Sequence, residues 1–280
     1  MRKIKTKIIK EEIARMCIEA CCDISPGIID AYEAAMETEA SDAGRNILEQ
    51  LIENAKIAST EKIPACQDTG MTVVFVEIGE EVILEGDNIT TAINEGVRKG
   101  YEDGFLRKSV VMHPLERINT GDNTPAVVYY EITKGDKVKL SVMPKGFGSE
   151  NMSALKMLKP SDGIKGIIEF IIETIDKAGP NACPPLFVGV GIGGTADKAM
   201  LIAKKALLRK PGVRSKIKAD AEIERILIEK ANKLGIGPAG LGGYNTVFDV
   251  FVESYPTHIA GLPVAVNICC HSMRHRECVI

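Results

Sequence analysis

The densest chemistry in the sequence lies in residues 64–70, which read PACQDTG. This segment places a thiol, an amide and a carboxylate on the consecutive residues Cys66, Gln67 and Asp68. Gly70 follows and can turn the backbone sharply. Polar groups gathered on a short connection are typical of a site that a rigid scaffold presents. Taken alone, the segment also fits a buried cysteine beside a helix-capping aspartate.

Two further cysteines share this setting. Cys183 precedes the apolar segment 186–192 through two prolines, and Cys270 follows the apolar segment 262–268. Thiolates are ligands that zinc and iron–sulfur clusters prefer. Three protein ligands leave one coordination position open, as Lewis-acid chemistry requires. Because Cys66, Cys183 and Cys270 are far apart in the sequence, they can meet only through the tertiary fold.

The chain has eight cysteines but no CxxC array, so a zinc ribbon or a ferredoxin-type cluster motif is not expected. Cys17, Cys21 and Cys22 fall on a helical pattern over residues 7–22 and are interpreted as packing residues. A non-enzymatic zinc site near the C-terminal end is an alternative, with these candidate ligands: Cys270, His271, His275 and Cys278.

Composition excludes several classes of partner. The 280 residues are 45% hydrophobic, enough for a large core. A net charge of −3 and a pI near 5.9 give no basic field for nucleic acid or an anionic membrane. The basic first residues are not followed by a continuous apolar stretch, and no uncharged apolar run of about 18 residues exists. We therefore expect a cytoplasmic protein with no nucleic-acid or membrane partner.

The periodicity predicts an α+β fold, in which a helical N-terminal layer packs on mixed β-sheets as one domain over residues 1–280. The first 60 residues are expected to be all helical, with Ser41 capping the third helix. A Lys-Gly-Asp turn at 134–136 between two apolar segments predicts a β-hairpin. The expected helices are 7–22, 28–36, 42 onward, 88–101, 162–178, 197–208 and 219–234, and the expected strands are 71–78, 127–132, 137–143, 186–192, 246–254 and 262–268.

Residues 144–151, PKGFGSEN, form a glycine-punctuated loop that is neither a Walker A motif nor a GxGxxG fingerprint. Its backbone N–H groups and Lys145 could converge on a small anion. A plain turn is the alternative.

Several segments in the same order resemble the class I iron–sulfur fumarate hydratase and L-tartrate dehydratase family, specifically the alpha subunit of its two-chain form. They are CQDTG, NTGDNTPA, KGFGSEN, ACPPLFVGVGIGG and the ending with Cys270 and Arg274. The resemblance covers essentially the whole chain. It implies a [4Fe-4S] cluster held by Cys66, Cys183 and Cys270, with substrate bound to the fourth iron.

The resemblance also implies a set of residues around a small dicarboxylate substrate. Arg107 would grip a carboxylate as a fork, and Lys145 would belong to the loop that holds its oxygens. Asp68 would donate a proton to the departing hydroxyl, and burial beside an anionic substrate would favour its protonated form. The remaining substrate-side residues are Gln67, Gly148 and His258, the last of which could instead be a structural histidine.

The implied reaction is the reversible hydration of fumarate to (S)-malate. Single-chain family members carry the base and further substrate-binding cations in a second domain, so the resemblance implies a separate beta subunit and a dimer of alpha–beta heterodimers. Residues 145–151 fit the KGxGS-type loop of fumarases. Phe147 and Glu150 depart from its commonest form, which leaves L-tartrate dehydration as the alternative.

Overall fold

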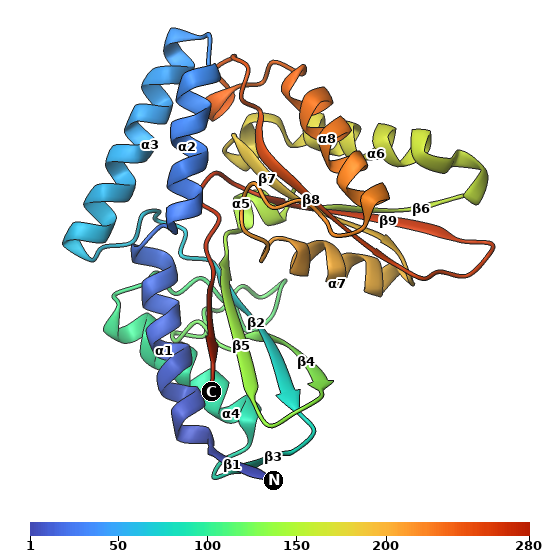
Figure 1. The fold of residues 1–280 in the computed structure, drawn as a ribbon. Helices are drawn as coiled ribbons and strands as arrows, with labels where there is room; N and C mark the ends of the chain where they lie inside the picture. The colour runs from blue at the N-terminus through green and yellow to red at the C-terminus, as the bar shows by residue number, and fades with distance from the viewer. The chain divides into compact units, whose positions relative to one another are not determined.

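The computed structural model describes residues 1–280, which divide into two compact units (Figure 1). Unit 1 comprises Met1–Ser25, Ala55–Phe147 and Arg274–Ile280, and unit 2 comprises Pro26–Asn54 and Gly148–Met273. The α+β class with mixed sheets is confirmed. The single domain over 1–280 stays a prediction. None of the helices combines the length and the apolar composition needed to cross a bilayer.

Unit 1 is built on a mixed four-stranded sheet, with a parallel pair of short strands beside it. The central strand β2 runs antiparallel to β5 and parallel to β4. The four strands are, in spatial order, β10 (Arg276–Val279), β5 (Val138–Lys145), β2 (Met71–Gly79) and β4 (Val127–Thr133), and the short pair is β1 (Arg2–Lys5) and β3 (Val82–Glu85).

The predicted hairpin is wrong in its pairing, although both of its strands exist. β2 lies between β4 and β5, so these two strands do not bond to each other. The turn that joins them instead crosses the end of β2, where Glu81 N–H donates to the Gly135 carbonyl at 3.0 Å. β2 is mostly buried along its length and therefore needs a neighbour on both edges. A local hairpin would have left it with one.

Two helices of unit 1, α1 (Thr6–Cys22) and α4 (Ile89–Asp103), pack closely against each other. A Cβ atom at Gly96 or Gly100 would lie 2.6 or 2.8 Å from a backbone oxygen of α1, so glycine is required at both positions for this approach. Asn88 caps α4, since its side-chain oxygen accepts a bond from Thr90 N–H at 2.9 Å. Cys17, Cys21 and Cys22 are buried in the core of this unit, which confirms their packing role.

Unit 2 has three layers, in which a second mixed sheet lies between two layers of helices (Figure 1). Helices α6 (Gly163–Ala178) and α8 (Lys218–Asn232) pack on one face, and α7 (Ala196–Ala206) packs on the other. A Cβ atom at Gly189 or Gly191 of β7 would lie 2.0 or 2.1 Å from a carbonyl oxygen of α7. The glycines of VGVGIGG therefore let α7 lie against the sheet. The strand order is β6 (Ala154–Leu158), β9 (Leu262–Cys269), β7 (Leu186–Gly193), β8 (Val247–Tyr255).

Several short elements were missed. The first 60 residues are not all helical, because β1 precedes α1, α2 (Pro26–Thr38) and α3 (Asp42–Glu61). Strands β3, β6 and β10 were also not predicted, since four or five residues are too few to show a clear alternation. Ser41 does cap α3, because its hydroxyl accepts a bond from Gly44 N–H at 3.2 Å.

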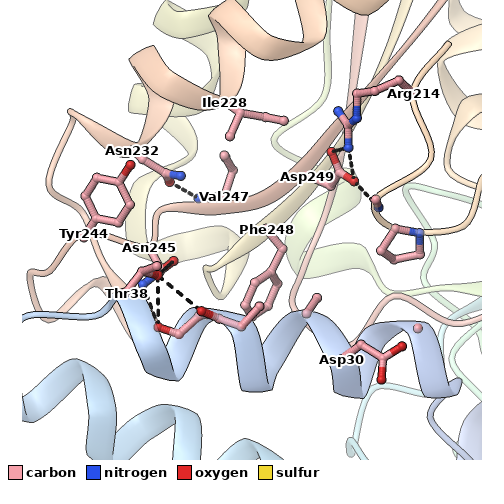
Figure 2. A pocket seen from close by; sticks show the side chains of 16 residues that line it. Asp30, Thr38, Arg214, Ile228, Asn232, Tyr244, Asn245, Val247, Phe248 and Asp249 are labelled. Carbon is pink, nitrogen blue, oxygen red and sulfur yellow. Dashed lines mark hydrogen bonds and ion pairs between the residues drawn. The ribbon is translucent and has the colours of Figure 1, made fainter.

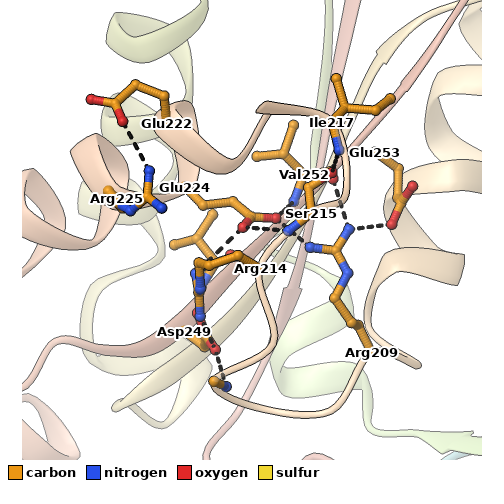
Figure 3. A network of polar contacts seen from close by, with 12 residues as sticks. Arg209, Arg214, Ser215, Ile217, Glu222, Glu224, Arg225, Asp249, Val252 and Glu253 are labelled. Atoms are coloured by element: carbon orange, nitrogen blue, oxygen red, sulfur yellow. Dashed lines mark hydrogen bonds and ion pairs between the residues drawn. The ribbon is translucent and has the colours of Figure 1, made fainter. Parts of the chain in front are cut away.

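A network of ion pairs fixes the connection between α7 and α8 onto β8 (Figure 3). The side chain of Glu224 is fully buried and forms an ion pair with Arg209. It also accepts bonds from Val252 N–H at 2.9 Å and Ser215 N–H at 3.0 Å. Arg214 pairs with the buried Asp249. Each buried carboxylate thus has both an arginine and backbone N–H groups, which offset the cost of removing it from water.

The buried Glu39, which follows α2, joins that helix to the segment before β8. Its carboxylate accepts bonds from Ser41 N–H (3.0 Å), Tyr244 N–H (2.9 Å), and both N–H (3.0 Å) and Nδ2 (2.9 Å) of Asn245. Burial alone would raise the pKa of Glu39, but these hydrogen bonds outweigh it and lower the pKa below its usual value.

We expect Glu39→Gln to lower the free energy of unfolding at pH 7 by about 2–4 kcal/mol, because the new amide nitrogen cannot accept the bonds of buried N–H donors. Urea-induced unfolding measures the change. Glu37→Gln, an exposed change on α2, is the control and should stay within about 0.5 kcal/mol of wild type.

The deficit of Glu39→Gln should depend on pH. A carboxylate with a lowered folded-state pKa stabilises the fold above its unfolded pKa of about 4.3, and this stabilisation is lost as the pH falls through the folded-state pKa. The two proteins should therefore converge in acid. A deficit that is constant from pH 7 to pH 3 would contradict the role of the ionised carboxylate.

Candidate functional site

The segment of residues 64–70 is held in unit 1 by its backbone. Tyr101 Oη donates to the carbonyl of Thr69 at 2.7 Å and to that of Gly70 at 3.1 Å. Asn123 Nδ2 also donates to the Gly70 carbonyl, at 3.2 Å. Gly70 has φ +76°, and a Cβ atom there would lie 2.6 Å from the backbone of Lys145. Only glycine therefore allows this close approach to the end of β5.

Asp68 connects this segment to the chain after β5. Its Oδ1 accepts a bond from Gly70 N–H at 3.0 Å, and its Oδ2 accepts one from Phe147 N–H at 2.8 Å. The buried Arg274 donates from Nη2 to the Asp68 carbonyl at 2.5 Å and from Nε to the Pro144 carbonyl at 3.3 Å. The Asp68 carboxylate thus has a fixed orientation, and each oxygen retains a lone pair for another partner.

Arg107 lies on a connection that is tied to the same segment. Thr69 Oγ1 donates to the Arg107 carbonyl at 2.9 Å, and Ser109 N–H donates to Asn123 Oδ1 at 2.7 Å. The Arg107 side chain itself is exposed, as is that of Gln67. The structure therefore brings together the backbones that carry Gln67, Asp68 and Arg107 while leaving two of the three side chains open to solvent.

Lys145 is the last residue of β5 and is buried. Its Nζ lies 3.4 Å from the Gly146 carbonyl oxygen. Lys145 pairs with Met71, directly after the 64–70 segment, in the register of β5 and β2. The predicted anion loop thus begins beside the segment that contains Asp68.

In unit 2, the sheet brings two of the three predicted ligand loops together. β7 and β9 are antiparallel neighbours, so the residues before β7 lie beside those after β9. His271 N–H donates to the Cys183 carbonyl at 3.2 Å. Cys183 follows the short helix η2 (Gly179–Ala182) and adopts a left-handed conformation with φ 54° and ψ 69°. The backbones at Cys183 and at Cys270–His271 therefore meet at one end of the sheet.

Two other predicted site residues belong to unit 2: His258 lies away from the two cysteine loops, and Gly148 is at a position that does not require glycine. His258 lies in the exposed connection between β8 and β9, where its Nδ1 accepts a bond from Ala260 N–H at 3.2 Å. It is at the opposite end of β9 from Cys270, and eight residues of strand span roughly 25 Å. Gly148 lies in α5 (Phe147–Glu150), and a Cβ atom there would make only ordinary contact, 3.7 Å from the Asn181 carbonyl oxygen.

The eight thiols fall into two kinds. None forms a disulfide, but Cys17, Cys21, Cys22 and Cys269 are buried, whereas Cys66 and Cys270 are partly accessible and Cys183 is exposed. Burial raises the pKa of Cys21 to about 12, that of Cys278 to about 11, and that of Cys22 above its usual value. Neutral thiols are poor metal ligands. Cys66, Cys183 and Cys270, as accessible thiols on loops outside any disulfide, fit the chemistry of cluster ligation.

Within either unit, no group of three or more His, Cys, Asp or Glu side chains is arranged to hold a metal ion. Cys66 belongs to unit 1, and Cys183 and Cys270 belong to unit 2. The fit of these three cysteines to one cluster therefore rests on the chemistry of their thiols as ligands.

A cavity of about 460 Å³ lies in unit 2 between α2, the segment at 211–214 and β8 (Figure 2). None of the predicted site residues lines it. The charge of Arg214 in its wall is matched by Asp249, and Asn245 is bonded to Glu39. The cavity is therefore separate from the candidate site.

Sequence reasoning missed the residues that position the 64–70 segment. Asn123 lies within the NTGDNTPA motif, but its role depends on two bonds to distant backbone groups. Tyr101 was noted only as the end of a helix, and Arg274 only as part of the C-terminal motif. The available signal for Tyr101 was its place on the same helical face as Ile93 and Val97, where a tyrosine hydroxyl needs a hydrogen-bond partner.

A family model described as fumarate hydratase (Fumerase) matches residues 10–279. A Methanocaldococcus jannaschii protein, provisionally named L(+)-tartrate dehydratase subunit alpha, is 46% identical over 272 residues, which is 95% of each chain. The L(+)-tartrate dehydratase subunit alpha of Escherichia coli K12 is 34% identical over 251 residues, which is 88% of this chain and 82% of the relative; the Shigella sonnei protein of that name matches equally well.

The chain therefore belongs to the fumarate hydratase (Fumerase) family, and the names of its relatives bear out its resemblance to the alpha subunit of the two-chain form.

We expect Asn123→Ala to lower the free energy of unfolding by about 2–3 kcal/mol. The change removes a donor to the buried Gly70 carbonyl and the acceptor of the partly buried Ser109 N–H bond, and alanine is also strained at the φ of +61° found there. Denaturant unfolding measures the loss. Asn46→Ala on the exposed face of α3 is the control, and equal stability of the two variants would contradict the positioning role.

Proposed function

We propose that this chain is the alpha subunit of a [4Fe-4S]-dependent hydro-lyase that reversibly hydrates fumarate to (S)-malate and requires a beta subunit. The observation that carries the proposal is the family match over residues 10–279, joined to relatives that are named alpha subunits and match over most of their length. Assembly as a dimer of alpha–beta heterodimers and a cytoplasmic location belong to the same proposal.

The proposed cluster ligands are Cys66, Cys183 and Cys270. Two features support this set: the antiparallel β7–β9 pair brings the Cys183 and Cys270 backbones together, and four of the other five thiols are buried. When bound, such a cluster supplies an iron with an open position, which acts as a Lewis acid on the substrate hydroxyl.

The chain's own residues would bind the dicarboxylate and move one proton. Arg107 binds a substrate carboxylate through its guanidinium fork, and Gln67 and the segment 145–148 hold further oxygens. Asp68 donates a proton to the departing hydroxyl. Its bonds from Gly70 and Phe147 N–H groups fix the orientation of the side chain before substrate binds.

His258 completes the proposed set in a different way. Because it lies at the far end of β9 from Cys270, it can serve a site built around Cys270 only from a second copy of the chain. This requirement agrees with the proposed dimer of heterodimers.

L-tartrate is the second candidate substrate. The observation that favours it is that the relatives cited above carry the name L(+)-tartrate dehydratase subunit alpha. The fit of residues 145–151 to the KGxGS-type loop favours fumarate. Malate and L-tartrate, the two candidate substrates for dehydration, differ by one hydroxyl group. Binding alone discriminates weakly between two molecules that differ in this way.

Activity of the alpha–beta complex, assembled under strict anaerobiosis, tests the substrate. We expect kcat/KM to favour malate and fumarate over L-tartrate by about tenfold to a hundredfold, the range that one additional hydroxyl produces. The opposite preference would establish the second candidate. No dehydration of either substrate at full iron content would refute the hydro-lyase proposal.

A cysteine series tests the cluster ligands. Replacing Cys66, Cys183 or Cys270 by Ser should abolish the broad visible absorbance and reduce iron and sulfide well below about four of each per chain. Cys269→Ser is the matched control, because Cys269 is buried and adjacent strand residues point to opposite faces. If Cys269 proves necessary and Cys270 does not, the third ligand has been assigned one residue too late.

A further inference from the structure

The connection of residues 105–118 in unit 1, called here the docking loop, displays large apolar side chains to solvent. Phe105 is 92% exposed, Leu115 84%, Met112 69% and Ile118 57%. Single exposed apolar residues are ordinary on protein surfaces, but several on one short loop mark an interaction site.

The docking loop is nevertheless ordered by its own hydrogen bonds. Met112 N–H donates to the Ile118 carbonyl at 2.8 Å, and Arg117 N–H donates to the His113 carbonyl at 3.0 Å. Asn119 Nδ2 donates to the Lys108 carbonyl at 3.0 Å. The apolar side chains are thus presented by a defined backbone, which reduces the entropy that a partner must remove on binding.

Phe105 adds backbone strain to this exposure. Its φ is +50°, the left-handed region that costs a residue with a Cβ atom free energy relative to glycine. Strain of this kind at an exposed aromatic residue is retained at functional positions, and aromatic side chains are enriched at the centres of interfaces. Because the Phe105 side chain is almost fully exposed, little of it can pack against the rest of the chain.

The docking loop is also continuous with the candidate site. It contains Arg107, whose carbonyl accepts the Thr69 hydroxyl bond from the segment that carries Asp68. It is mainly basic, with Arg107, Lys108 and Arg117 against the single acidic residue Glu116. A partner that covers the apolar side chains would therefore lie beside the substrate-binding residues and would carry an acidic rim.

We propose that the docking loop, residues 105–118, is a surface on which the beta subunit docks, with Phe105 and Leu115 as apolar anchors. This inference rests on the proposed function, which supplies the beta subunit as partner. Docking here buries the four apolar side chains and places the residues of the beta subunit beside Arg107.

The test measures binding of the beta subunit of the same enzyme to this chain by isothermal titration calorimetry under anaerobiosis. Phe105→Gly and Leu115→Asp should each weaken binding by about tenfold or more, as expected for interface anchors. Ile164→Asp, which changes a 53% exposed residue in the first turn of α6, is the control and should bind as wild type.

Phe105→Gly separates docking from folding. Glycine relieves the left-handed strain, so thermal unfolding of this variant should occur at the same temperature as wild type or higher while binding of the beta subunit weakens. A purely structural Phe105 would give the reverse: lower stability with unchanged affinity.

The other possible outcomes distinguish a wrong docking surface from a wrong function. If the beta subunit binds wild type, Phe105→Gly and Leu115→Asp equally, the docking loop is the wrong surface and the proposed function stands. If it does not bind wild type, the two-subunit function fails as well. If light scattering shows that Leu115→Asp abolishes self-association but leaves beta-subunit binding unchanged, the surface belongs to a second copy of this chain, and the proposal is overturned.

Discussion

Two backbone carbonyls, those of Thr69 and Gly70, are the points on which the unit 1 part of the candidate site depends. A carbonyl in a tight turn cannot pair within a strand, and leaving it unpaired in the interior would be costly. Tyr101 and Asn123 supply the missing donors from a helix and from a loop. Because these donors are buried and rigidly placed, the neighbouring Asp68 carboxylate is also held in one orientation.

Unit 2 uses a different constraint, the close approach of a helix to a sheet. Gly189 and Gly191 leave no room for even a methyl group between β7 and α7, so the helix fixes the position of the strand. Since β7 begins just after Cys183 and its antiparallel neighbour β9 ends just before Cys270, placing the strand also places both connections. The ion pairs around Glu224 and the bonds to Glu39 secure the segments around β8 on the other edge of β7.

The positions of helices and strands with strong periodicity were predicted well, but the pairing of two of the strands was predicted wrongly. The helix at 7–22 and the strands at 71–78 and 186–192 lie where the sequence indicated, because each buries one continuous apolar face or core. The strands at 127–133 and 138–145 were also found, but they flank β2 instead of pairing with each other. The residues of the turn favour a hairpin, but the buried β2 needs a hydrogen-bonded neighbour on each edge. β2 therefore lies between the two strands.

The sequence by itself determined which residue types can do chemistry and that they lie on connections: Cys66, Gln67 and Asp68 on one, Cys183 and Cys270 on two others. These assignments depend on local composition and order, which a sequence displays directly. Only the tertiary structure decided that the Cys183 and Cys270 backbones meet, that His258 lies at the far end of β9, and that Tyr101 and Asn123 hold the first loop. Strand order and the pairing of buried polar groups join residues far apart in the chain, so no local pattern contains them.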